Sequence, residues 1–369
     1  MRGGYVRTRR FHALRQLLLC FSVLGCGEDN HPWLIPGLSE VRAETAEADS
    51  SWVAVPLREY GSLSGEISFG APVDATVLAD GSLVVADLYA CTLTVIARPD
   101  GRLRQKLGRC GDGPGEFRMI RIIDAFAGSL FVYDQGHGAV VVLDETGHET
   151  RRVPLEIVGG RGVTLSHLAV LDDSTLVIAT ESVDHAGVAL VDSRTGAFRR
   201  SLVEAPPIAV RSDGWIRHMA ACVEPNGRSP TIVATSEWAL EGVGLVSDTG
   251  EERFHFLTSL DLPPTLASGG AWVQGPARID VACGRSLALF RAVTVDPDDF
   301  TGSMADIRAS SVILEARAYD GALLMRRSIM DTSPVLRAPM GAFRGDTVFL
   351  LADRVRPYPV VSEIVLRPR

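Results

Sequence analysis

The sequence predicts an all-β protein, a six-bladed β-propeller closed by an N-terminal strand that completes the last blade. Three observations lead to this expectation. Glycine (36 residues) and proline (20 residues) recur along the 369-residue chain instead of clustering, which is typical of many short strands joined by turns. Two stretches in the first half of the chain repeat each other in order and spacing. Hairpin turns return at intervals of roughly 45–60 residues, the length of a four-stranded blade.

The chain begins with a segment that has the order of an export signal. Residues 1–15 are basic and contain no acid, residues 17–24 are mainly apolar, and Gly25 is a small residue just before Cys26. This order is typical of a secretory signal, and the apolar run is too short to remain as a membrane span. Residues 23–26 (Val-Leu-Gly-Cys) resemble a bacterial lipobox, which implies that residues 1–25 are removed and that Cys26 carries a lipid. The alternatives are an ordinary signal cut elsewhere or a mis-assigned start codon.

Residues 26–50 are polar, acidic and rich in alanine. Because such a segment buries little apolar surface, we expect a flexible tether between the lipid and a propeller formed by residues 51–369. The mature protein would then be anchored to a membrane of the cell envelope and face the periplasm or the exterior.

The formal net charge of −8 argues against one class of partner. Residues 1–25 hold five arginines and no acid, so the chain without them is more acidic still. Binding of nucleic acid relies on clustered cations that neutralise phosphates. We therefore expect no nucleic-acid partner.

The repeated stretches are residues 58–69 and 105–117. Each passes from a strand through glycines to a Gly-Glu pair and then to an aromatic residue. Each is followed by a strand that contains Asp-Ala, at Asp74-Ala75 and at Asp124-Ala125. Together with the Gly-x-Gly-x-Gly-Glu-Phe sequence at 111–117, this order resembles a blade of the NHL-repeat proteins. The resemblance covers about residues 52–150, and it implies a propeller that presents one face to a protein, glycan or other ligand.

Six turns mark the first hairpin of each expected blade. They are Asp80-Gly81, Gly128-Ser129, Asp172–Ser174, Asn226-Gly227, Gly284-Arg285 and Gly345-Asp346. The last blade runs out of chain after its third strand, so residues 53–60 are expected to supply its fourth strand and close the ring.

The second turns and the blade-to-blade crossings share one face of such a ring, and they hold the long irregular segments of the chain. Long loops on one face are where binding residues usually lie. The candidates there are Trp215, Trp238, Trp272, Phe300, His137, His185 and Arg354. The alternative is that these side chains pack loops onto the rim.

Several second strands end near a carboxylate. Asp87, Asp134 and Asp353 could form part of a ring of metal ligands that suits a hard cation such as calcium. Alternatively, an Asp at this position bonds the backbone amides of the following turn. The NHL resemblance favours this second interpretation, since NHL-like blades commonly carry an Asp there.

Four cysteines follow Cys20 and Cys26, and an even number in an exported domain indicates disulfides. Counting outward from the turn at Asp100-Gly101 places residue 91 opposite residue 109 or 110, so we expect Cys91 to pair with Cys110. Cys222 and Cys283 lie in the first strands of successive blades and could pair with each other. The alternative for this second pair is two buried free thiols.

No catalytic or phosphate-binding motif stands out in the sequence. The favoured function is therefore a non-catalytic binding or scaffold module for a protein or small ligand. The alternative is a metal-dependent hydrolase, lactonase or lyase with its site at the propeller channel, because some six-bladed propellers are such enzymes. Asp134, His137, His185 and Asp353 would then be the residues to test.

Overall fold

The computed structural model describes residues 52–98, 100–155, 164–181, 187–204, 219–225, 230–236, 241–246, 251–257, 276–295, 309–329, 340–344, 347–352 and 358–368. The regular structure within these ranges consists of β-strands. No helix there is long and apolar enough to cross a membrane.

The described residues form six four-stranded antiparallel sheets, which we number as blades in chain order. Blade 1 contains β2 (Pro72–Val77), β3 (Leu83–Asp87), β4 (Thr92–Ile96) and β5 (Leu103–Leu107). Blade 2 contains β8 (Ile120–Phe126), β9 (Ser129–Asp134), β10 (Ala139–Leu143) and β11 (Glu149–Pro154). Blade 3 contains β12 (Thr164–Asp172), β13 (Thr175–Glu181), β14 (Gly187–Asp192) and β15 (Phe198–Glu204).

The second half of the chain repeats this arrangement. Blade 4 contains β16 (Met219–Val223), β17 (Thr231–Ser236), β18 (Glu241–Val246) and β19 (Glu252–Leu257). Blade 5 contains β20 (Pro276–Cys283), β21 (Leu287–Val295), β22 (Ala309–Ala318) and β23 (Leu323–Ile329). Blade 6 contains β24 (Met340–Arg344), β25 (Thr347–Ala352), β26 (Val360–Pro368) and β1 (Trp52–Tyr60).

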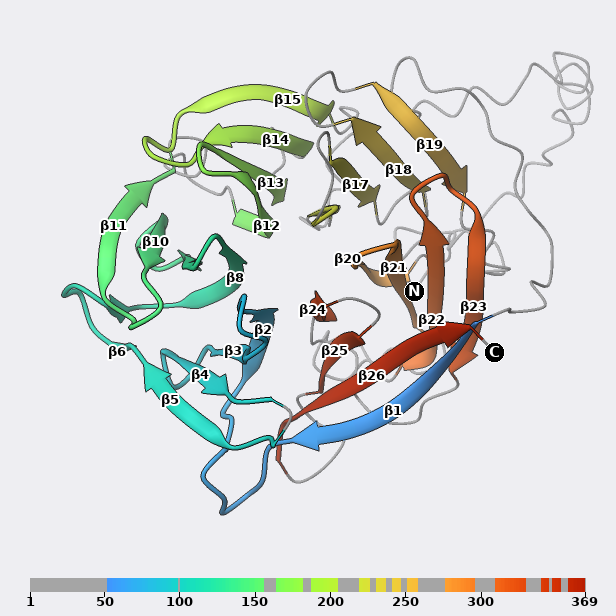
Figure 1. Ribbon diagram of the computed structural model, residues 1–369. Helices are drawn as coiled ribbons and strands as arrows, with labels where there is room; N and C mark the ends of the chain where they lie inside the picture. Colours follow the sequence, from blue (N-terminus) through green and yellow to red (C-terminus); the bar gives the residue numbers. More distant parts are fainter. Residues whose placement is uncertain are drawn as a thin grey trace, which may run out of the picture. The chain divides into compact units, whose positions relative to one another are not determined.

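The first strands of the blades meet around a common centre (Figure 1). Along the chain, β2, β8, β12, β16, β20 and β24 each contact the next, and β24 contacts β2. This cycle of contacts makes the blades a closed ring, as the sequence predicts.

The ring is closed by β1, which pairs antiparallel with β26 and places Val53 opposite Arg367 and Tyr60 opposite Val361. The prediction that an N-terminal strand completes the last blade is confirmed. A polar cluster fastens this closure, because the Tyr60 hydroxyl and the Arg98 guanidinium both donate to the buried Glu363 carboxylate. Arg98 follows β4, so Glu363 of blade 6 also holds blade 1.

The middle strands are buried on both sides, since each blade packs against a neighbour on either face. Every residue of β3 and of β10 is buried. Between blades 1 and 2, the core includes Val84, Leu93, Phe117, Val132 and Val141. Continuous apolar runs are what a strand needs when both of its faces are covered.

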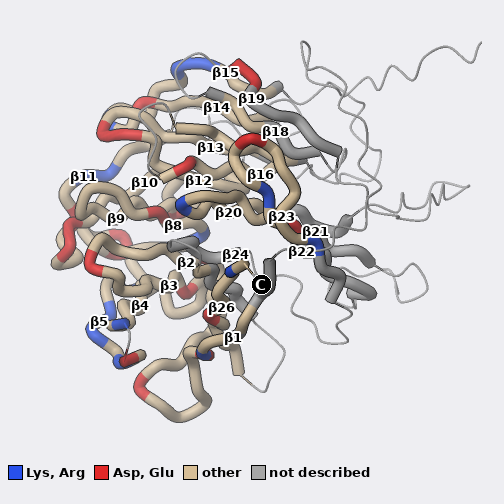
Figure 2. Tube along the Cα trace, turned by 45° about the vertical axis from the view of Figure 1, so that its right-hand side comes forward, with Lys and Arg blue, Asp and Glu red and all other residues tan. Residues whose placement is uncertain are grey.

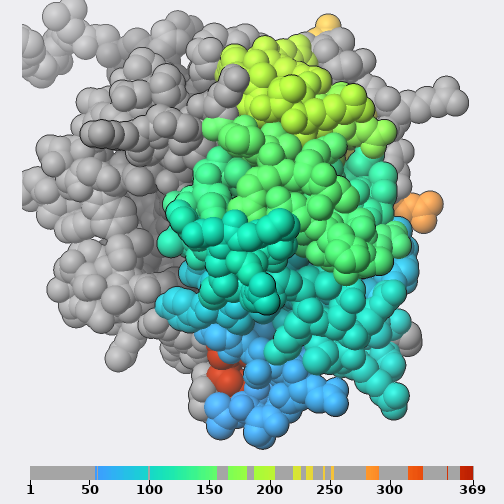
Figure 3. Space-filling view, turned by 90° about the vertical axis from the view of Figure 1, so that its left-hand side faces the viewer, coloured from blue at the N-terminus to red at the C-terminus, as the bar shows by residue number. Residues whose placement is uncertain are grey.

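The fourth strand is the outer edge of its sheet in blades 1 to 3. These edge strands carry cations, namely Arg104 and Lys106 on β5, Arg151 and Arg152 on β11, and Arg199 and Arg200 on β15 (Figure 2). Charged side chains on an edge discourage pairing with another chain. Figure 3 shows the outer edges of these blades side by side, with the blue N-terminal part of the described chain at the lower end.

Candidate functional site

A short crossing loop leads from β5 of blade 1 to β8 of blade 2. It contains β6 (Arg109–Cys110) and β7 (Glu116–Phe117), which pair in parallel. Glycine is required at its start, because Gly108 has φ +80° and a Cβ there would lie 2.4 Å from the buried ring of Phe117. Gly108 thus lets the backbone of the crossing loop turn and pack closely against the core at Phe117.

The described residues form two disulfides, the Cys91–Cys110 pair expected from the sequence and the Cys222–Cys283 pair that the sequence left open beside two free thiols. Cys91–Cys110 joins the start of the third strand of blade 1 to the crossing loop, with 5.0 Å between the Cα atoms. Cys222–Cys283 joins the first strands of blades 4 and 5, with 5.5 Å between the Cα atoms. The first bridge holds the crossing loop on blade 1, and the second holds two neighbouring blades together near the centre of the ring.

Asp134, the last residue of β9, is fully buried. Its Oδ1 accepts the N–H groups of Met119 (2.8 Å) and Gly136 (3.1 Å). Its Oδ2 accepts the N–H of Arg118 (2.9 Å) and lies 2.6 Å from His137 Nδ1. Burial alone would raise the pKa of Asp134, but these hydrogen bonds hold the pKa below its ordinary value.

Asp87 occupies the same place in blade 1, as the last residue of β3. Its carboxylate accepts the N–H groups of Gly70 (2.6 Å), Ala71 (3.1 Å), Tyr89 (3.1 Å) and Ala90 (3.0 Å). Both aspartates therefore fasten a blade-to-blade crossing and the second turn of their blade. This is the turn-capping geometry that the sequence offered as the alternative to a metal site.

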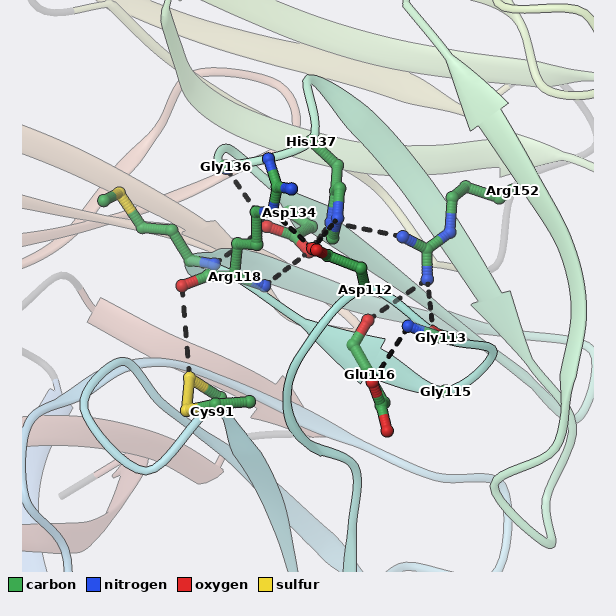
Figure 4. A network of polar contacts seen from close by, with 12 residues as sticks. Cys91, Asp112, Gly113, Gly115, Glu116, Arg118, Asp134, Gly136, His137 and Arg152 are labelled. Atoms are coloured by element: carbon green, nitrogen blue, oxygen red, sulfur yellow. Dashed lines mark hydrogen bonds and ion pairs between the residues drawn. A yellow bond between two sulfur atoms is a disulfide. The ribbon is translucent and has the colours of Figure 1, made fainter.

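The ring of His137 lies between two carboxylates (Figure 4). Nδ1 faces Asp134, and Nε2 lies 3.1 Å from Asp112 Oδ1. Each ring nitrogen thus faces a carboxylate oxygen to which it is placed to donate. Arg152 Nη1 lies 3.1 Å from Nδ1, and the Arg118 guanidinium pairs with Asp112. Hydrogen bonds from Arg118 and His137 hold the pKa of Asp112 at about 2.

Arg152 of β11 anchors the crossing loop to blade 2. It donates to both carboxylate oxygens of Glu149 (3.0 and 2.9 Å) and to the carbonyls of Gly113 (3.3 Å) and Glu116 (3.1 Å). Glu149 in turn accepts the N–H of Gly115 at 2.7 Å. The loop is thus held from one side by the disulfide and from the other by this arginine.

This network brings together two of the predicted site residues, Asp134 and His137. General base chemistry at His137 Nε2 would need Asp112 to move, since that side chain faces the nitrogen. Among the described residues, no group of three or more His, Cys, Asp or Glu side chains is placed to hold a metal ion. The described part of the network thus acts to fix the loop.

A cavity of about 350 Å³ lies at the centre of the ring, between the first strands of blades 1 to 5. One end of its lining is formed by exposed turn residues, namely Ala79, Ala127, Glu145 and Pro225. The cavity therefore opens on the face that carries the first and third turns. The sequence instead predicts binding residues on the opposite face, which carries the second turns and the blade-to-blade crossings.

Two aspartates of the first strands line this cavity, Asp74 and Asp124. Each reaches to the next blade: Asp74 Oδ2 accepts the N–H of Ile123 (2.8 Å), and Asp124 Oδ2 accepts the N–H of Val170 (2.7 Å). Burial, with the nearby charges of other carboxylates, raises the pKa of Asp74 to about 8 despite its hydrogen bonds. Burial likewise raises the pKa of Asp124 to about 6.

Most predicted ligand-face residues lie outside the described residues, so the structure does not test them. They are Trp215, Trp238, Trp272, Phe300, His185 and Arg354, together with the proposed metal ligand Asp353 and the lipidation site Cys26. The residues that the sequence analysis missed are Asp74 and Asp124. The Asp-Ala pair that recurs at one position of the first two blades is the sequence signal that could have located them.

No protein-family model matches the sequence, and no curated protein matches it. Its fold is similar to that of a DUF4221 family member from Bacteroides vulgatus, at 9% identity and a TM-score of 0.60 over 86% of this chain and 99% of that chain. The chain is a six-bladed β-propeller.

Two other solved structures share this fold. One is a protein from Bacteroides fragilis described as exported, at 12% identity and a TM-score of 0.53 over 89% of this chain and 98% of that chain. The other is regucalcin from Agrobacterium tumefaciens, described as calcium-binding, at 12% identity and a TM-score of 0.50 over 83% and 94%. At such identities the likeness establishes the propeller fold alone. The resemblance to NHL-repeat proteins stays a prediction.

Proposed function

We propose that this protein is an exported, lipid-anchored propeller that binds a small ligand in the cavity at the centre of its ring. The observation that carries the binding role is the cavity itself. Its volume of about 350 Å³ falls within the range of small-molecule sites, and both polar and apolar groups line it. The proposal keeps the non-catalytic role favoured from the sequence and moves the binding site to the opposite face.

The walls of the cavity are held rigidly, which supports a binding role. Asp74 and Asp124 tie their own strands to the next blades, and the Cys222–Cys283 disulfide lies in the wall formed by blades 4 and 5. A preformed site loses little conformational entropy when a ligand binds.

Export and anchoring rest on the N-terminal sequence and on the cysteines. Disulfides persist in oxidising compartments outside the cytoplasm, and this propeller contains two. The Val-Leu-Gly-Cys sequence at residues 23–26 supports lipidation at Cys26.

Blocking the mouth of the cavity tests the binding role. Ala79 is exposed and lines the cavity at its open end, so Ala79→Trp should fill the entrance without disturbing the core. In a small-molecule screen by ligand-observed NMR, hits of the wild type should be lost in Ala79→Trp. The matched control is Ala322→Trp, at an exposed position in the third turn of blade 5. Hits that survive Ala79→Trp, or the absence of hits, would contradict the proposal.

Anchoring is tested separately. Cys26→Ala should move the protein from the membrane fraction to the soluble fraction or leave its signal uncut, because the lipid-bearing residue is lost. A wild-type protein that is soluble, with a mature N-terminus other than residue 26, would exclude the lipid anchor while leaving the cavity proposal intact.

The alternative function, a metal-dependent hydrolase, lactonase or lyase, has a direct test. Metal analysis of the purified protein should find no tightly held ion. One calcium or transition-metal ion per chain would instead favour the enzyme, with a site that includes residues beyond the described ranges.

A further inference from the structure

The two disulfides differ in how far solvent reaches them. In the Cys91–Cys110 bridge, Cys110 is exposed in the crossing loop, whereas Cys91 is only 4% exposed and belongs to the core between blades 1 and 2. In the other bridge, Cys222 is buried and Cys283 is half-buried. Thiol–disulfide exchange begins when a thiolate attacks an accessible sulfur atom of the bridge. A thiol that approaches from solvent therefore meets Cys110 first.

The surroundings of the Cys91–Cys110 bridge also suit its reduced form. Cys110 Sγ lies 3.8 Å from the carbonyl oxygen of Ala90. Cys91 Sγ lies 3.9 Å from the carbonyl oxygen of Leu88 and 4.0 Å from that of Arg118 (Figure 4). A thiol is a weak hydrogen-bond donor, whereas a disulfide sulfur has no proton to donate. Reduction would thus give each new S–H group an acceptor close by.

The crossing loop should keep its place when the bridge opens, because other contacts hold it. Asp134 accepts two backbone N–H groups at the end of the loop, and Arg152 donates to two of its carbonyls. Within the loop, the Gly111 N–H donates to the Phe117 carbonyl at 3.0 Å. The two cysteines would then remain neighbours after reduction, and this proximity favours closing the same bridge again.

We propose that Cys91–Cys110 is a thiol-exchange site, which a dithiol reduces reversibly while the propeller stays folded. One thiolate of the dithiol attacks Cys110 Sγ, the S–S bond breaks, and Cys91 leaves as a thiolate that takes up a proton. The second thiolate of the dithiol then attacks the dithiol's own sulfur in the mixed disulfide, so that Cys110 is released and protonated. Two electrons and two protons pass to the bridge, and the dithiol becomes a disulfide.

Exchange at this bridge does not involve the central cavity, so it is independent of the proposed ligand binding. The Cys222–Cys283 bridge serves as an internal control, because it joins the first strands of two blades and neither of its cysteines is exposed. We expect it to stay closed under conditions that open the bridge at the crossing loop.

Graded reduction of the folded protein tests the exchange site. The full-length oxidised protein in detergent is incubated with dithiothreitol, alkylated at intervals and mapped by mass spectrometry, while circular dichroism follows the fold. The Cys91–Cys110 bridge should open about ten-fold faster than Cys222–Cys283, or more, with an unchanged spectrum. Oxidised glutathione should then restore the same pair. Opening of both bridges together, or only as the spectrum is lost, would overturn the proposal.

A monothiol tests which sulfur is attacked. Reduced glutathione has no second thiol to complete the reaction, so it should leave a mixed disulfide on Cys110 of the folded protein. Cys91 should carry none, because it is buried. Glutathione found mainly on Cys91 would contradict the order of steps.

Two single variants measure the same asymmetry without any reductant. Cys91→Ser leaves Cys110 as a free thiol, and Cys110→Ser leaves Cys91. In the folded proteins, iodoacetamide should alkylate Cys110 about ten-fold faster than Cys91. In urea the two rates should become similar, which separates burial from any other cause. Equal rates in the folded variants would overturn the assignment of Cys110 as the attacked residue.

Discussion

At the scale of single residues, one amino acid serves two structural roles in this propeller. Asp87 and Asp134 cap the crossings with hydrogen bonds from backbone N–H groups. Asp74 and Asp124 sit at the centre of the ring and accept N–H groups from the next blade. The environments differ, so the pKa of Asp134 is lowered whereas that of Asp74 is raised to about 8.

The raised pKa of Asp74 predicts a pH-dependent stability. In the unfolded chain its carboxyl ionises near its ordinary pKa of 3.8, whereas in the folded ring it ionises near 8. Stability from the neutral carboxyl is fully present below pH 4 and is lost as the pH rises toward 8. Asp74→Asn should remove this loss, so its melting temperature relative to the wild type should increase between pH 5 and pH 8.

The measurement is thermal unfolding across that range. Asp320→Asn is the control, because Asp320 is exposed in a turn and should not change the pH profile. Parallel profiles of Asp74→Asn and the wild type would show that Asp74 is not the titrating group.

At the scale of elements, the two repeated crossing loops carry different reinforcement. Both are capped by the aspartate that ends a second strand, Asp87 for residues 61–71 and Asp134 for residues 108–119. The second loop adds the Cys91–Cys110 disulfide and the anchors from Arg152. Its conformation is thus fixed at both ends, between blade 1 and blade 2.

Removal of the Cys91–Cys110 bridge should lower the stability of the ring. The cysteines are 19 residues apart, and closing a loop of this length contributes about 3 kcal/mol. We expect the Cys91→Ser/Cys110→Ser protein to lose about that much free energy of unfolding in urea. The Cys222→Ser/Cys283→Ser protein serves for comparison. It should lose more free energy of unfolding, because the Cys222–Cys283 bridge joins residues 61 positions apart and so closes a longer loop. Free thiols at Cys91 and Cys110 in non-reducing peptide maps would contradict the pairing.

At the scale of the whole molecule, stability depends on closure of the ring. The two ends of the described chain meet in one sheet, where β1 forms the outer edge beside β26. Tyr60 and Arg98 bind Glu363 across that closure, so blade 6 is joined both to the N-terminal strand and to blade 1.

Deletion of residues 51–60 should therefore destabilise the entire propeller. It removes a strand of blade 6, exposes the edge of β26 and leaves buried Glu363 without Tyr60. We expect one cooperative transition at a melting temperature lower by ten degrees or more. Deletion of residues 41–50, an equal length of the predicted tether, is the control and should leave melting unchanged. Unchanged melting of the 51–60 deletion would contradict the role of β1.

The sequence by itself determined the fold, the blade order and the closing strand. It could do so because strand length, turn chemistry and repeat spacing are local properties, and glycines such as Gly108 are imposed by the backbone at their own position. The pairing of Cys91 with Cys110 followed from the same register, because these two cysteines flank one hairpin. The capping role of Asp87 and Asp134 was among the alternatives that the repeat itself offered.

Only the tertiary structure decided where a ligand could bind. Asp74 and Asp124 are 50 positions apart in the sequence and become neighbours in one cavity because the ring brings successive first strands around a common centre. Loop length predicts binding residues on the opposite face, because long irregular segments can be recognised in a sequence. A cavity between blades cannot be recognised there, because it forms only when the ring closes. Burial, which raises the pKa of both aspartates, and the repulsion of Asp74 by other carboxylates arise from contacts between blades and cannot be read from any one of them.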